Sequence, residues 1–381
     1  MARSWAYSAC CGLSIVLLLL PSPWHWKARN TGTLLYIGWA VTGNFIFMVN
    51  SIIWNGNYEK ELHGWCDVVI HLIIGMSIGL VMAGLCINRR LYDIATIKSV
   101  TIDRDSRRRR IMVDLLLGVG FPIVVMCLAY VTQSNRYDIL EDIGCWPPNY
   151  PTLPGIFLSL WWPIPISTAS LFYAVMSIRA FLRARRQFTQ ALGSGSHGIN
   201  MSRYFRMMGL SCGEILCSLP LSIYILVSTL HMKMWPWVSW ADTHYKWAQI
   251  HHVPAIALQQ NMVVWRAFMV NQWIVPAGGF LFFLWFGLAG EALDEYKKLF
   301  YFLVRPFGIK PSPPKPKVVL SGNSNWVSRI GSSLASGQQN TAMSLPELSQ
   351  IQSSPTDEKS TQHDITEEKL DYKAPHASSA V

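Results

Sequence analysis

Charge is the scarcest property of this sequence. Of its 381 residues, 14% are Asp, Glu, Lys or Arg and 51% are hydrophobic, whereas about a quarter of an ordinary soluble domain is charged. The sequence also has no Walker phosphate-binding loop, no HExxH zinc motif and no CxxC pair among its eight cysteines. These absences argue against a soluble enzyme, and we expect no catalytic residues, no metal and no cofactor.

Long apolar runs occupy most of the sequence instead. A helix needs roughly 20 apolar residues to cross the hydrocarbon core of a bilayer. Seven runs of this length cover residues 5–23, 32–54, 65–87, 111–132, 154–178, 207–230 and 263–288. The pattern predicts an all-α membrane protein, with a bundle of seven transmembrane helices over residues 1–288.

The first apolar run has a second interpretation, because a removable signal peptide also begins a chain with a short apolar segment. No small-residue cleavage site follows this run. Pro21, Pro23 and the bulky Trp24-His25-Trp26 follow instead. The sequence therefore favours a first membrane helix.

Basic residues are concentrated in alternate loops. The loops after runs one, three and five carry sixteen Lys and Arg, and the loops after runs two, four and six carry four. Basic residues in short loops stay on the cytoplasmic side of a membrane. We therefore expect an extracellular N-terminus and a cytoplasmic C-terminus, and we expect no nucleic acid as a partner.

Two further segments follow the last run. Over residues 289–310, apolar residues at helical spacing are interleaved with charged ones, which predicts an amphipathic helix in the membrane interface. Residues 311–381 are rich in Ser, Thr, Gln and Pro and poor in aromatic residues. A segment of that composition cannot bury enough apolar area to fold, so we expect a disordered cytoplasmic tail.

Two cysteines fall outside the lipid on the expected exterior side. Cys66 lies at the start of the third run, and Cys145 lies in the loop between runs four and five. Disulfides persist in that oxidising environment. We expect a bridge between them that pins the loop over the bundle.

Few charged residues lie inside the runs, and each is a candidate for function because charge is costly to bury in lipid. Asp67 and His71 are four residues apart and share one face of a helix. Either both contact a ligand, or Asp67 lies among the lipid headgroups while His71 bonds a neighbouring helix. Asp114, at the inner end of the fourth run, is expected to be solvated. The last run contains no Lys, which argues against a retinal protein.

Several short strings occur in an order and spacing that resembles one receptor family. They are Pro23-Trp24-His25-Trp26, Asn44, Val49 through Trp54, Trp65-Cys66-Asp67, Cys86 through Leu91, Pro236 through Trp240, and Glu291-Ala292 with Tyr296. Over about residues 1–300 the chain resembles the fungal receptors for lipidated mating pheromones, the a-factor receptor family of class D G protein-coupled receptors. The resemblance implies a farnesylated, carboxymethylated peptide ligand outside, a heterotrimeric G protein inside, and a place in the plasma membrane.

A prenylated ligand requires an apolar and aromatic site. Trp161 and Trp162 lie in the outer half of the fifth run, and Trp265 and Trp273 lie in the outer half of the seventh. These tryptophans either line the ligand pocket or form an aromatic belt that faces lipid.

The cytoplasmic side carries the expected contact surface for the G protein. Its basic residues are Arg89, Arg90, Arg107, Arg108, Arg109 and Arg110. This surface suits either an acidic protein partner or anionic membrane lipids.

Glu214 is a candidate switch residue, because it lies seven residues into the sixth run, about 10 Å deep at 1.5 Å per residue. A latch between Glu214 and Arg89, with Arg90 as the second choice, would hold two helices together at rest. Pro220 would then be the bend that lets the sixth helix move. The alternative is a protonated Glu214 bonded to a backbone carbonyl or to a buried water.

Two functions are compatible with seven spans. One is a pheromone-activated receptor that performs no covalent chemistry, and the other is a small-solute transporter or channel. A transporter requires internal repeats and a polar lining near the membrane midplane, and the sequence shows neither. We therefore expect the receptor.

Overall fold

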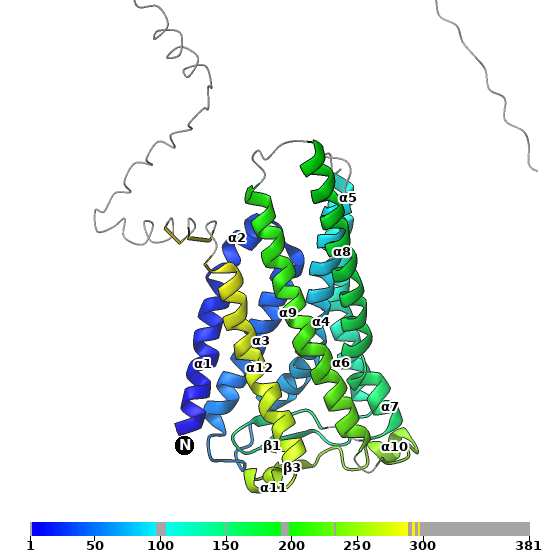
Figure 1. Cartoon of the computed structure of the whole chain (residues 1–381). Coiled ribbons are helices and arrows are strands. Elements are labelled where there is room, and N and C mark those ends of the chain that lie inside the picture. The colour runs from blue at the N-terminus through cyan, green and yellow to red at the C-terminus, as the bar shows by residue number, and fades with distance from the viewer. Residues whose placement is uncertain are drawn as a thin grey trace, which may run out of the picture. The chain divides into compact units, whose positions relative to one another are not determined.

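The computed structural model describes residues 2–96, 104–148, 151–191, 198–231 and 234–288, with the short stretches 292–293 and 296–297. Within these ranges, seven helical segments are long and apolar enough to cross a membrane. They are Trp5–Lys27, Thr31–Ile53, His63–Thr96, Arg104–Tyr130, Leu153–Arg183, Phe205–Leu230 and Met262–Phe286. Each overlaps one of the seven apolar runs, so the predicted seven-helix bundle is confirmed (Figure 1).

Four of the spans are single helices, and three are built from several elements. The single helices are α3 (Thr31–Ile53), α4 (His63–Thr96), α9 (Gly198–Leu230) and α12 (Met262–Phe286). The first span comprises α1 (Ala2–Leu19) and α2 (Ser22–Lys27). The fourth comprises α5 (Arg104–Leu115), the π-helical turn η1 (Leu116–Gly120) and α6 (Phe121–Tyr130), and the fifth comprises α7 (Leu153–Gly155), the π-helical turn η2 (Ile156–Leu160) and α8 (Pro163–Ala191).

A three-stranded sheet covers one end of the bundle. Its strands β1 (Tyr137–Leu140), β2 (Gly144–Trp146) and β3 (Ile250–Val253) lie in the order β2-β1-β3, with β1 antiparallel to β2 and parallel to β3. Two short helices, α10 (Trp240–Thr243) and α11 (Ala255–Gln260), flank β3 in the chain. Strands of three or four residues are too short to show an alternating pattern, so this sheet was not predicted from the sequence.

The two ends of the bundle differ. The N-terminus lies at the end that carries the sheet, and α2 lies at the opposite end (Figure 1). We call these the sheet end and the α2 end. The last turns of α4 and α8 and the first turns of α5 and α9 also lie at the α2 end (Figure 1).

Helix α4 is the centre of the bundle. It contacts α3, α6, α8 and α9 and is the most buried of the seven spans. Two of its glycines make room for neighbouring helices, Gly75 for Met126 on α6 and Gly79 for Trp39 on α3. A Cβ added to Gly79 would lie 2.3 Å from the indole ring of Trp39, which is too close for any side chain.

Trp39 also satisfies a backbone carbonyl in the fourth span. Its Nε1 donates to the carbonyl oxygen of Gly118 at 2.8 Å. Gly118 lies four residues before Pro122, which has no N–H and therefore cannot make the helical hydrogen bond to that carbonyl. In lipid such a carbonyl needs a donor from a neighbouring helix, and Trp39 supplies it.

The same arrangement recurs in the seventh span. Pro276 lies inside α12, and Gln272 precedes it by four residues. The hydroxyl of the buried Tyr7, on α1, donates to the carbonyl oxygen of Gln272 at 3.1 Å. Two of the prolines that interrupt the predicted spans are thus each matched by a donor on another helix.

Three predictions fall outside the described residues and stay predictions. They concern most of the amphipathic helix at 289–310, the disordered tail at 311–381, and the side chain of Glu214.

The hydrogen bond from Tyr7 to the carbonyl oxygen of Gln272, which Pro276 leaves without a helical donor, generates a stability prediction. Tyr7→Phe removes the donor to a buried carbonyl and should cost about 1 kcal/mol. In a Pro276→Ala background, where the introduced alanine supplies its own N–H, the cost should be much smaller. The measurement is the melting temperature of the four purified proteins, with Tyr245→Phe as a control because Tyr245 is 82% exposed. Equal costs of Tyr7→Phe in both backgrounds would contradict this account of the hydrogen bond.

Candidate functional site

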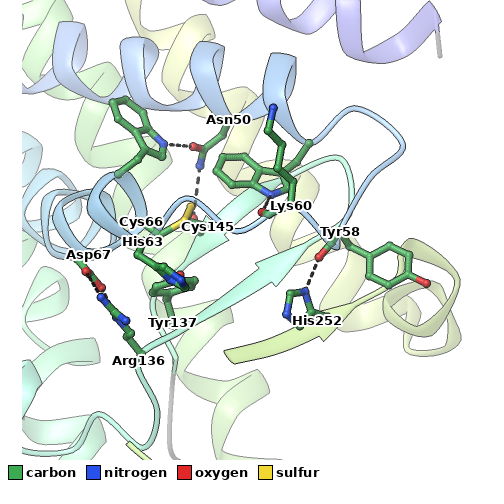
Figure 2. Close-up of a disulfide and its surroundings, with 12 residues drawn as sticks. Asn50, Tyr58, Lys60, His63, Cys66, Asp67, Arg136, Tyr137, Cys145 and His252 are labelled. Atoms are coloured by element: carbon green, nitrogen blue, oxygen red, sulfur yellow. Dashed lines mark hydrogen bonds and ion pairs between the residues drawn. A yellow bond between two sulfur atoms is a disulfide. The ribbon is translucent and has the colours of Figure 1, made fainter. Parts of the chain in front are cut away.

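The disulfide between Cys66 and Cys145 fixes the sheet to the bundle. Cys66 lies on the first turn of α4 and Cys145 lies on β2, and both are fully buried (Figure 2). The expected bridge between the third span and the loop that joins the fourth and fifth spans is therefore present in the structure. The bonded residues are 79 positions apart in the chain.

Asn50 supports the disulfide from α3. Its side chain accepts a hydrogen bond from Trp65 Nε1 at 2.9 Å and donates to the carbonyl oxygen of Cys145 at 3.4 Å (Figure 2). The neighbouring Gly144 has a φ of +89°, and a Cβ there would lie 2.7 Å from Asn50. Only glycine fits both the backbone conformation and this close approach.

A bidentate ion pair ties the same loop to α4. Arg136 donates from Nε to Asp67 Oδ1 at 2.8 Å and from Nη2 to Asp67 Oδ2 at 2.7 Å (Figure 2). The hydrogen bonds with Asp67 raise the pKa of the Arg136 guanidinium above its usual value. Both carboxylate oxygens of Asp67 are therefore engaged by protein.

His71 makes a local contact. Its Nδ1 lies 2.8 Å from the carbonyl oxygen of Asp67 on its own helix. The expected bond from His71 to a neighbouring helix is therefore wrong, because His71 bonds α4 itself. The position of Asp67 among lipid headgroups stays a prediction. Whether either residue contacts a ligand stays a prediction.

The chain just before α4 and the first residue of α4 also contact the sheet. Glu61, just before α4, holds two histidines: Oε2 lies 3.3 Å from His63 Nε2, and Oε1 lies 3.2 Å from His252 Nε2 on β3. His63 Nδ1 lies 2.6 Å from the hydroxyl of Tyr137 on β1. The loop between α3 and α4 is thereby joined to both β1 and β3.

A cavity of about 580 Å³ lies beneath the sheet, among α4, α8, α9 and α12. Its lining residues on α9 run from Leu210 to Thr229, which corresponds to about 28 Å of helix. Toward the α2 end the wall is apolar, with Leu80, Val81 and Leu281. At the sheet end the wall is more polar, with Gln133, Asp138 and Asn271 among its residues.

None of the six residues predicted to bind ligand, all of which the structure describes, lines this cavity. The aromatic wall is supplied instead by Trp146 on β2 and Phe268 on α12, whose ring centroids are 5.0 Å apart. Trp146 was not predicted as a lining residue, because it lies in a loop rather than in an apolar run.

The predicted tryptophans lie elsewhere. Trp161 borders a separate shallow groove on α8 and is 36% exposed, and Trp273 is 37% exposed with its ring 5.0 Å from Tyr7. Trp162 packs edge-on against Phe121 at 5.1 Å. Trp265 is partly buried. All four tryptophans therefore lie outside the cavity. Whether they bind ligand or form an aromatic belt stays a prediction.

At the α2 end, Arg89 is paired with Asp114, and its predicted contact with Glu214 lies outside the described side chains. Its Nη2 lies 2.6 Å from Asp114 Oδ1, and the side chain of Asp114 is 6% exposed. The expectation that Asp114 is solvated is therefore wrong. The charge of Arg89 compensates the buried carboxylate, which explains how Asp114 is tolerated inside the fourth span. Cys86, one turn earlier on α4, also points at the backbone of Asp114.

Most of the other basic residues of the α2 end remain accessible. Arg107, Arg108 and Arg109 are exposed on α5, and Arg110 is partly buried. Arg90 donates to the carbonyl oxygen of Arg29 at 2.7 Å, which joins α4 to the turn after α2. The α2 end thus presents a row of exposed guanidinium groups on α5.

The string Gly75-Met76-Ser77-Ile78-Gly79 has the spacing of the hydrolase nucleophile motif GxSxG. In a hydrolase that serine lies on a sharp turn between a strand and a helix. Here Ser77 lies in the middle of α4, and its hydroxyl donates to the carbonyl oxygen of Ile74 at 2.7 Å. The surroundings are those of a helix interior and not of a catalytic nucleophile.

Seven membrane spans, a disulfide-pinned sheet over one end, a cavity beneath that sheet and a basic opposite end define a seven-helix membrane protein. The family model described as pheromone A receptor, STE3, matches residues 6–306. The chain belongs to this family of multi-pass membrane proteins, whose members are receptors and not enzymes.

Three relatives illustrate the similarity. The pheromone B alpha 1 receptor of Schizophyllum commune is 36% identical over 317 residues, which cover 82% of this chain and 50% of that protein. Pheromone receptor 1 of Mycosarcoma maydis is 30% identical over 76% of this chain and 81% of its own length. The pheromone a factor receptor of Saccharomyces cerevisiae is 28% identical over 78% of this chain and 62% of its own length. The chain spans about half the length of the Schizophyllum relatives.

The disulfide generates the prediction for this site. Cys66→Ser and Cys145→Ser should each reduce the melting temperature and the amount of folded protein to a similar degree, because each removes the same bond. The double variant should be no worse than either single variant. A free thiol at Cys145 that reacts with maleimide in the native protein, or additive losses in the double variant, would argue against the bond. Cys127→Ser, which removes an exposed free cysteine, is the matched control.

Proposed function

We propose that this protein is a G protein-coupled receptor for a lipidated, farnesylated peptide pheromone. The single observation that carries the proposal is the cavity beneath the sheet, which is apolar in its depth and polar at its mouth. A prenyl chain gains about 0.8 kcal/mol for each CH₂ group that leaves water. The apolar depth suits that chain, and the polar mouth suits the peptide.

The orientation follows from the charges. The basic loops lie at the α2 end and the disulfide lies at the sheet end. Basic loops favour the cytoplasm, and disulfides persist outside it. We infer that the sheet end faces the exterior of the plasma membrane, and that the α2 end binds a heterotrimeric G protein through the arginines of α5.

Filling the cavity tests the proposed binding site. Gly213 lines the cavity, and a Cβ there would touch only Leu281, at 3.5 Å. Gly213→Leu should therefore fold, occupy the space of the prenyl chain, and weaken the response to farnesylated peptides at least about tenfold. The measurement is guanine-nucleotide exchange on a G protein in membranes that carry the chain, with synthetic farnesylated peptides added.

Gly38→Leu is the matched control. Gly38 lies exposed on α3, and a Cβ there meets nothing within 4 Å, so this variant should respond as the parent does. Equal responses of the two variants would overturn the cavity as the prenyl site. An absence of nucleotide exchange with every farnesylated peptide would overturn the proposed function.

The Arg89–Asp114 pair gives a second prediction. It joins α4 to α5 beside the proposed G protein surface, so breaking it should favour other arrangements of that end even without ligand. Asp114→Asn and Arg89→Gln should each raise basal nucleotide exchange, and the double variant should not exceed the larger single effect. Unchanged basal exchange in a normally expressed Asp114→Asn variant would show that the pair is only structural. Adding Glu214→Gln tests the earlier latch hypothesis separately.

A further inference from the structure

One charged residue lies in the wall of the cavity. Among the residues that the structure describes, the lining includes Asp138 and no Glu, Lys, Arg or His. Asp138 lies on β1, directly opposite Trp146 on β2 and His251 on β3. Cross-strand partners point to the same face of a sheet, so an indole, a carboxylate and an imidazole form one row, of which Trp146 and Asp138 line the cavity.

Only one of the two carboxylate oxygens of Asp138 has a partner among the described residues. Oδ1 accepts a hydrogen bond from Asn135 Nδ2 at 2.8 Å and lies 3.3 Å from His251 Nδ1. Oδ2 has no partner among the described residues. Burial raises the pKa of this carboxyl above its usual range, and the contacts with Asn135 and His251 oppose that shift. The side chain is 23% exposed, so a ligand in the cavity can reach it.

We propose that Asp138 and Trp146 form a cation-recognition site, which selects lipidated peptides that place an ammonium or guanidinium group at the cavity mouth. This inference rests on the proposed function and names the specificity-determining residue of the same cavity. The peptide cation pairs with Oδ2 of Asp138 beside the indole of Trp146, while the lipid occupies the apolar depth.

Two physical effects make such a site selective. A carboxylate removed from water attracts a cation more strongly than one at the surface, and an indole adds a cation–π attraction. A neutral peptide group at the same place leaves the charge of Asp138 without a counterion, and an acidic group repels it. The site therefore discriminates by charge, whereas the apolar part of the cavity discriminates by size.

A charge-paired set of ligands tests the site. The probes are synthetic hexapeptides of Gly and Ser that end in an S-farnesyl-cysteine methyl ester, with one lysine placed in turn at each position. Each has a counterpart in which that lysine is Nε-acetylated, which removes the charge and little else. Binding of both sets is measured with the full chain in lipid nanodiscs.

The parent protein should bind the lysine peptide about tenfold more tightly than its acetylated counterpart for at least one position, which corresponds to about 1.4 kcal/mol. In Asp138→Asn the preference should fall to within about twofold, with the affinity for acetylated peptides retained. Glu59→Gln removes an exposed carboxylate from the loop between α3 and α4 and should keep the preference.

A second variant tests the site independently of whether Asp138→Asn folds. His251→Lys keeps the carboxylate and places a permanent cation beside it at a side chain that is 57% exposed, so it should also abolish the preference. Farnesylated peptides that bind the parent without any preference for lysine overturn this inference and leave the proposed function intact. A preference that persists in both variants overturns it as well. If no farnesylated peptide binds, the proposed function fails and this inference fails with it.

Discussion

The bond between Cys66 and Cys145 determines how the sheet end is built. Because it fixes β2 to the first turn of α4, the other two strands of the sheet have a defined position above the bundle. Trp146 follows Cys145 directly and reaches the cavity wall. The Asp67–Arg136 ion pair and the contacts of Asn50 reinforce the same junction. Covalent and polar contacts therefore add to the apolar cluster of Tyr137, Ile139 and Trp54 in fixing the sheet over the cavity.

Within the bundle, the constraint is that backbone carbonyls near prolines need hydrogen-bond donors. Lipid offers no hydrogen-bond donors, so a proline inside a span leaves a carbonyl that another helix must satisfy. Trp39 and Tyr7 do this for Pro122 and Pro276. Each of these hydrogen bonds crosses between spans and depends on their spacing. A movement of α12 relative to α1 must therefore stretch the Tyr7 bond, which couples the bends in the helices to the packing of their neighbours.

The seven spans could be predicted from the sequence because long apolar runs and alternating basic loops are physical requirements of a membrane helix. The disulfide was predictable for the same reason, since orientation left two exterior cysteines. The polar contacts were harder. Arg136, the single basic residue of its loop, could have suggested the pair with Asp67, but the pairing of Arg89 with Asp114 depends on how α4 packs against α5. Asp138 and Trp146 reach the cavity only through the sheet, which has no signal in the sequence.

The parallel pairing of β1 with β3 has a consequence for biosynthesis. Tyr137 pairs with Ile250 and Leu140 pairs with Val253, so the two strands are separated by two complete spans of the chain. β3 cannot join the sheet until the sixth span has entered the membrane, although the hairpin of β1 and β2 is available much earlier. The cavity beneath the sheet is thus closed late in the assembly of the chain, after the hairpin that carries Cys145 is available.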